Sequence, residues 1–84
     1  MAGPFRIDPM TSLGGIPTSG SGKQTKVMDT NTTGLVGYIK MQAGLSAAVQ
    51  NDILPGTVEL DRDFGGMPLT VTNLGQCALT VSTQ

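Results

Sequence analysis

The sequence predicts an all-β fold, namely a small antiparallel β-sandwich or barrel of about six short strands with an extended N-terminal arm. Three observations lead to this expectation. Short segments alternate apolar and polar residues, turn-forming residues recur at roughly ten-residue spacing, and a Leu-Thr-Val core occurs twice near the end. Alternation with period two places successive side chains on opposite faces of a strand. We expect an arm over residues 1–22 and a β-domain over residues 23–84.

The clearest strand signal lies at 68–73 (PLTVTN) and 78–83 (ALTVST). In both segments Leu and Val share one face, and hydroxyl-bearing residues share the other. The intervening Asn-Leu-Gly-Gln predicts a hairpin. Thr70, Thr72 and Thr80 would then form one hydroxyl face. This face is either an exposed sheet surface or a contact surface for another subunit, because hydroxyls and methyls tolerate burial better than charges do.

Three earlier segments, 24–29, 35–42 and 57–61, also alternate as strands. The stretch 43–51 is ambiguous. Leu45, Ala48 and Val49 fit a helical turn, whereas Leu45, Ala47 and Val49 fit a strand. Its short length and Gly44 weaken the helix, so a strand is favoured. Pro55-Gly56 then predicts a turn.

The first 22 residues contain three prolines and five glycines, which disfavour a regular helix. Apolar residues nevertheless recur every two or three positions. Such a segment suits docking along a groove or sheet edge of another molecule, and a disordered tail is the alternative. The candidate anchors are Phe5, Ile7, Met10, Leu13 and Ile16.

Composition favours association over independent stability. Eighty-four residues form one small domain, and only 13% of them are charged, about half of the usual quarter. With one cysteine and no histidine, neither a disulfide nor a structural zinc site is expected. The net charge of −1 offers no electrostatic footprint for nucleic acid. We expect neither a signal peptide nor a membrane span.

Catalysis is not expected, because no histidine is present to act as a base for Cys77 or a serine. Glu59, Asp61 and Asp63 alternate along one predicted strand and its turn. They form either a solvated acidic edge or a weak divalent-cation site, since the ligands of a full calcium loop are missing. No cofactor or resident metal is therefore expected.

An apolar-anchored arm followed by a small β-domain resembles small bacteriophage virion proteins, such as capsid cement, decoration or minor structural proteins. The resemblance implies a non-enzymatic assembly protein of the virion, assembled in the host cytoplasm. Its partners would be capsid or other virion subunits and copies of itself, without nucleic acid or membrane. The alternative is a small ligand-binding, adhesin or fibre module using the threonine face or the acidic turn.

Overall fold

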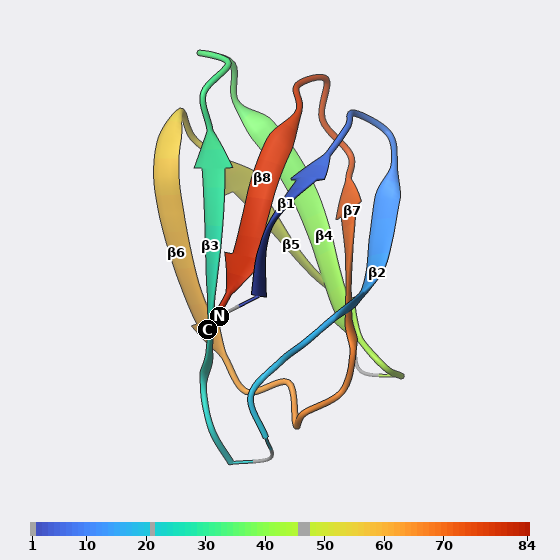
Figure 1. Ribbon diagram of the computed structural model, residues 1–84. Helices are drawn as coiled ribbons and strands as arrows, with labels where there is room; N and C mark the ends of the chain where they lie inside the picture. Colours follow the sequence, from blue (N-terminus) through green and yellow to red (C-terminus); the bar gives the residue numbers. More distant parts are fainter. Residues whose placement is uncertain (1, 21, 46–47) are drawn as a thin grey trace.

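A computed structural model of the protein describes residues 2–20, 22–45 and 48–84. They form two four-stranded antiparallel sheets packed face to face (Figure 1). The strands are β1 (Ala2–Ile7), β2 (Ser12–Ile16), β3 (Thr25–Asn31), β4 (Gly37–Ala43), β5 (Val49–Ile53), β6 (Gly56–Arg62), β7 (Leu69–Asn73) and β8 (Leu79–Thr83).

One sheet has the order β1-β8-β3-β6, and the other has the order β2-β7-β4-β5. The expected all-β sandwich is thus confirmed, with eight strands instead of about six and without closure into a barrel. Within the described ranges, no helix is long and apolar enough to cross a membrane.

The prediction of an extended N-terminal arm is wrong. Residues 2–7 and 12–16 are the edge strands β1 and β2, which pair with β8 and β7. Ile7 and Ile16 are only 2% and 1% exposed and belong to the core. Prolines and glycines at these edges do not prevent pairing, because an edge strand needs hydrogen bonds on one side only. The apolar spacing in this segment is therefore that of edge strands that place only some of their apolar side chains in the core.

The expected hairpin between the two Leu-Thr-Val segments is also wrong, although both segments are strands. β7 pairs with β2 and β4, whereas β8 pairs with β1 and β3 in the opposite sheet. The connection over residues 74–78 crosses between the sheets (Figure 1). Each segment directs its Leu and Val into the shared core, so the alternation is the same as in a hairpin.

The two halves of the chain are related by an approximate two-fold arrangement. Strands β1, β2, β3 and β4 of the first half correspond to β5, β6, β7 and β8 of the second half. If each strand is exchanged for its counterpart, the order β1-β8-β3-β6 of the first sheet becomes β5-β4-β7-β2. This is the order of the second sheet read backwards. Each sheet thus takes two strands from each half. Neither half has a complete sheet of its own, so the halves depend on each other for folding.

The stretch 43–51 divides between two strands and a turn. β4 ends at Ala43, and β5 begins at Val49. Gly44 has a positive φ of 56°, which favours glycine at the turn. Residues 46 and 47, which include part of the expected strand, lie outside the described residues.

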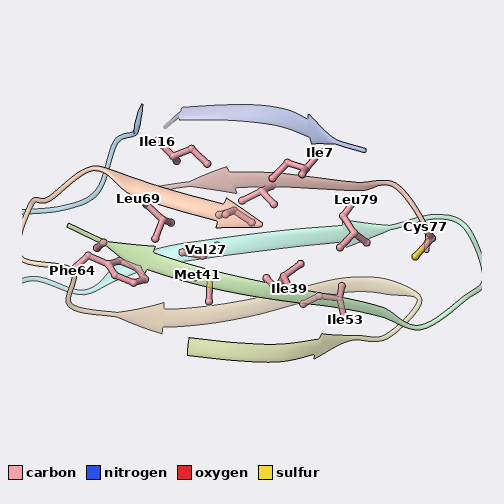
Figure 2. Close-up of a cluster of buried hydrophobic side chains, with 13 residues drawn as sticks. Ile7, Ile16, Val27, Ile39, Met41, Ile53, Phe64, Leu69, Cys77 and Leu79 are labelled. Carbon is pink, nitrogen blue, oxygen red and sulfur yellow. The ribbon is translucent and has the colours of Figure 1, made fainter. Parts of the chain in front are cut away.

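The core lies between the sheets and receives side chains from both (Figure 2). Burial of each Leu, Ile or Val side chain contributes about 1.5–3 kcal/mol relative to exposure. Polar side chains also enter this space, namely Asp29, Asn31 and Asn73. The buried apolar residues are Ile7, Ile16, Val27, Ile39, Met41, Ala43, Ile53, Phe64, Leu69, Val71, Cys77, Leu79 and Val81.

Candidate interaction surface at the loop end

Four loops gather at one end of the sandwich, the upper end in Figure 1. They comprise residues 8–11, 32–36, 54–55 and 74–78, and we call this surface the loop end. It is formed by connections that cross from one sheet to the other. The approximate two-fold exchanges the first loop with the third and the second with the fourth.

The loop end carries four large apolar side chains that are exposed to solvent. Met10 is 75% exposed, Leu54 60%, Leu35 58% and Val36 57%. The other large exposed apolar residue of the described chain is Leu45, which lies at the opposite end in the turn after β4. Single exposed apolar residues are ordinary, but a group of them at one end indicates an interaction surface.

Asn31 anchors the loop 32–36 from inside the sandwich. Its Nδ2 donates to the backbone carbonyl oxygens of Leu35 and Ile53, the latter at 3.0 Å. Its Oδ1 accepts from the Thr33 amide at 3.1 Å and from the Thr33 hydroxyl at 2.7 Å. An asparagine that bonds the backbone two residues later forms a tight turn. This turn leaves the Leu35 side chain in solvent while its carbonyl is held.

Asn73 does the same for the loop 74–78. Its Nδ2 donates to the carbonyl oxygens of Ile7 at 3.1 Å and Cys77 at 2.7 Å. Its Oδ1 accepts from the Gly75 amide at 3.0 Å. Each asparagine thus ties its own loop to the last residue of a strand in the opposite sheet, Ile7 for Asn73 and Ile53 for Asn31.

The remaining two loops share the pattern Ile-x-Pro-x-Thr, at 7–11 and at 53–57. The fourth residue has a positive φ in both, 61° at Met10 and 108° at Gly56. This conformation suits glycine and is unusual for methionine. In the first loop the Thr11 hydroxyl donates to the Asp8 carbonyl at 2.6 Å.

A shallow pocket of about 210 Å³ lies beside the loop end, on the outer side of the sheet that contains β8 and β3. The Arg6 guanidinium contributes to its lining, but its Nε is already bonded to Asp8 Oδ1 at 3.0 Å. Both side chains are largely exposed, at 75% and 64%. The other lining residues are Thr30, Thr32, Thr33, Ala78, Leu79 and Thr80. Hydroxyls and one paired cation provide no nucleophile with an adjacent base.

Of the three acidic residues singled out in the sequence, Asp61 and Asp63 line one open pocket of about 370 Å³, and Glu59 is not part of its lining. Lys26 lies 3.9 Å from Glu59 and pairs with Asp61 across the strands. Asp63 follows the end of β6 and accepts hydrogen bonds from the amides of Gly22 and Gly65. In the described residues, no group of three His, Cys, Asp or Glu side chains could hold a metal ion. Asp63 therefore acts as a loop cap.

The proposed partner-binding residues of the first strands are distributed between core and surface. Ile7 and Ile16 are buried, Phe5 and Leu13 are half-buried against the core, and only Met10 is exposed at the loop end. Whether the accessible ones bind a partner stays a prediction.

The threonine face is likewise divided. Thr70 and Thr72 lie on the outer side of the sheet that contains β7, whereas Thr80 lies on the outer side of the opposite sheet. Ser12 and Thr72 hydrogen-bond through their hydroxyls at 2.8 Å. The three threonines therefore cannot form one contact surface within a single molecule.

Local strand and turn patterns predict a turn at Asn73 and do not reveal the buried role of either asparagine. A signal for them is present in the sequence. Thr-Asn occurs at 30–31 and again at 72–73, and Ile-x-Pro-x-Thr also occurs twice. Repetition at half the chain length indicates an internal two-fold arrangement, which no local strand pattern reveals.

Comparison with known proteins places the chain in a family. No solved structure matches it. Two uncharacterized proteins of Dictyostelium discoideum are 42% and 40% identical to it over 83 residues, covering 99% of this chain and 99% of each relative. Residues 5–84 match a family of unknown function, DUF8244. The chain belongs to this family, DUF8244.

Proposed function

We propose that the protein is a non-enzymatic assembly module that associates through its loop end, and that the loop end binds a second copy of the same chain. The observation that carries this proposal is the grouping of Met10, Leu35, Val36 and Leu54 at one end of the sandwich. Burial of such side chains against a partner contributes about 25 cal/mol per Å² of apolar surface.

The charge distribution supports an apolar occupant. Among the residues of the four loops, only Asp8 is charged. Arg6, its partner, projects from the adjacent strand β1. A surface with so little charge does not attract nucleic acid or an anionic membrane through electrostatics.

The Arg6–Asp8 ion pair favours a second copy of this chain as the partner that binds the loop end. In a two-fold interface, residue i of one subunit meets residue j of the other, and the reverse. Arg6 and Asp8 have opposite charges and are both exposed at the rim of the loop end. Two copies that meet end to end can thus place each Arg6 against the other copy's Asp8. The loop end is self-complementary in this respect.

Light scattering of the full chain over a range of concentrations tests the proposal. We expect a dimer of twice the 8.6 kDa chain mass. The double substitution Leu35→Ser with Val36→Ser should yield monomers, because it removes apolar contact area at the loop end. The matched control is Leu45→Ser, a fully exposed residue at the opposite end, which should remain dimeric. Circular dichroism confirms that each variant folds.

Charge reversal tests the pairing itself. Arg6→Asp alone and Asp8→Arg alone should each weaken self-association, because like charges then face each other. A mixture of the two variants should form heterodimers, since opposite charges meet again at both contacts. A wild-type chain that stays monomeric at every concentration overturns the proposal. So does a dimer that only Leu45→Ser dissociates.

The more specific expectation of a virion component remains a proposal that these comparisons do not support. Both relatives come from Dictyostelium discoideum, and no match links the family to a phage. The alternative of a ligand-binding or adhesin module would use the threonine face or the acidic turn, where pockets lie at Thr80 and at Asp61 and Asp63. A chain that is monomeric but binds a small ligand there would favour this alternative.

A further inference from the structure

Asp29 is a buried carboxyl group in the centre of β3. The residue is 0% exposed. Neither of its carboxylate oxygens has a hydrogen-bond partner. An ionised carboxylate in this position loses its hydration without compensation, which strongly favours the protonated form. Asp29 occurs 42 positions before Val71, its counterpart in the other half of the chain, where the same inward position holds an apolar side chain.

The residues around Asp29 provide no charge to compensate it. Its register partners are Val58 on β6 and Val81 on β8. The inward residues of β5 in the opposite sheet are Val49, Asn51 and Ile53. The inward residues of β4 and β7 are also non-ionisable. Among the buried residues described, Asp29 is the only one with a carboxyl or a basic side chain.

Asn51 lies on β5, which contacts β3, and it also has a buried polar atom without a hydrogen-bond partner. Its Oδ1 is buried and has no partner. β3 and β5 both end at the loop end, where Asn31 Nδ2 bonds the Ile53 carbonyl. Asp29 precedes Asn31 by two residues, and Asn51 precedes Ile53 by two. Counted back from this bond, Asp29 and Asn51 are each two residues away on strands that contact each other, and the oxygens of Asp29 and the Oδ1 of Asn51 are buried acceptors without a donor.

We propose that Asp29 is a proton-operated switch that controls how tightly β3 packs against β5. A proton on Asp29 removes the buried charge and supplies the O–H donor that this part of the core lacks. Loss of the proton leaves a bare carboxylate among valines, which can be hydrated only if β3 and β5 separate. Separation at this level strains the adjacent Asn31–Ile53 bond, which holds two loops of the loop end together.

The direction of the pH effect follows from burial, which raises the pKa of Asp29 from 3.8 to about 7. The unfolded chain releases this proton near pH 4, whereas the folded chain retains it to about pH 7. Folded protein therefore binds more protons between these values, and stability decreases as pH rises through this window. Each pH unit inside it raises the unfolding equilibrium constant by up to tenfold. Below and above this pH window, the contribution of Asp29 to the free energy of unfolding does not change with pH.

Two measurements on the full chain test the switch. The carboxyl carbon of Asp29, followed by NMR from pH 3 to 9, should titrate near pH 7. Urea unfolding at the same pH values should show the decline in stability. Asp29→Asn should remove this decline, because it cannot ionise. The matched control is Asp52→Asn on the exposed side of β5, which should retain it.

Amide hydrogen exchange locates the opening. Amides of β3, β5 and the loop 32–36 should lose protection between pH 5 and 7 beyond the intrinsic effect of hydroxide, and those of Asp29→Asn should not. An Asp29 titration near pH 4 overturns the proposal, and this result does not depend on any variant folding. An unchanged pH slope in folded Asp29→Asn overturns it as well.

Discussion

Asn31 and Asn73 perform the same structural task in the two halves of the sandwich. Each carboxamide nitrogen bridges the carbonyl four residues later and the carbonyl of an isoleucine that ends an edge strand. Each carboxamide oxygen accepts from the amide two residues later. The two residues fix the four loops that form the loop end, so the surface proposed for association depends on them.

We expect Asn73→Ala and Asn31→Ala each to lower the free energy of unfolding by about 2–4 kcal/mol, because each leaves two carbonyls without their donor in the interior. Urea denaturation at pH 6 measures the effect. The matched control is Gln76→Ala, an exposed residue of the loop that Asn73 holds, with a change within about 0.5 kcal/mol. Asparagine variants as stable as this control would contradict the assignment.

Deletion of residues 1–16 should abolish cooperative folding. It removes β1 and β2, the pairing partners of β8 and β7, and two fully buried isoleucines. Loss of one such side chain costs about 2–5 kcal/mol, comparable with the whole stability of a small domain. Thermal unfolding followed by circular dichroism reports the result, with Met10→Ser as the exposed control. A truncated chain with an unchanged transition would instead indicate a dispensable arm.

Met10 and Gly56 occupy equivalent positions of the two Ile-x-Pro-x-Thr turns, and both have a positive φ. We therefore expect substitutions at these two positions to change the free energy of unfolding in opposite directions. Met10→Gly should raise the free energy of unfolding by up to about 1 kcal/mol, because φ is 61° and the side chain is mostly in solvent. Gly56→Ala should lower it by about 1–2 kcal/mol, although no atom lies within 4 Å of the added methyl. Chemical denaturation of both variants measures the two signs, and the same sign for both would refute this explanation.

Asp29→Val replaces the buried carboxyl with the side chain found at the equivalent position, Val71. The variant should be more stable than the wild type, and the gain should be larger at pH 8 than at pH 4. The difference between the two pH values should be about 4 kcal/mol, from a pKa raised from 3.8 to about 7. Urea titrations of both proteins at the two pH values provide the measurement. A gain independent of pH would mean that the folded chain releases the Asp29 proton at the same pH as the unfolded chain, as expected for a carboxylate that is already hydrated.

The sequence by itself determined the fold class, the apolar faces of the strands and the absence of a histidine-based catalytic group. These properties depend on local alternation and composition. In β3, β4, β7 and β8, the residues expected on one face are buried together. The pattern works because a strand has a period of two whichever strand it pairs with.

Only the tertiary structure decided which strands pair. The segments before and after Asn73 look like a hairpin, yet they lie in opposite sheets, because a loop of five residues is long enough to cross a sandwich as well as to turn within a sheet. Phe5 to Ile16 looks like an arm, yet it supplies two edge strands. Alternation gives the same signal for a buried edge strand and for a segment docked on another molecule.

The candidate site also required the assembled fold. Met10, Leu35 and Leu54 are far apart in the sequence, and their common exposure at one end follows from four crossings between the sheets. Asp29 looks like an ordinary polar residue at the end of a strand. Its unusual position depends on register, which places Val58 and Val81 on either side of it. Alternation within β3 fixes which of its side chains face inward, but it does not specify which residues of the distant strand β8 lie beside Asp29.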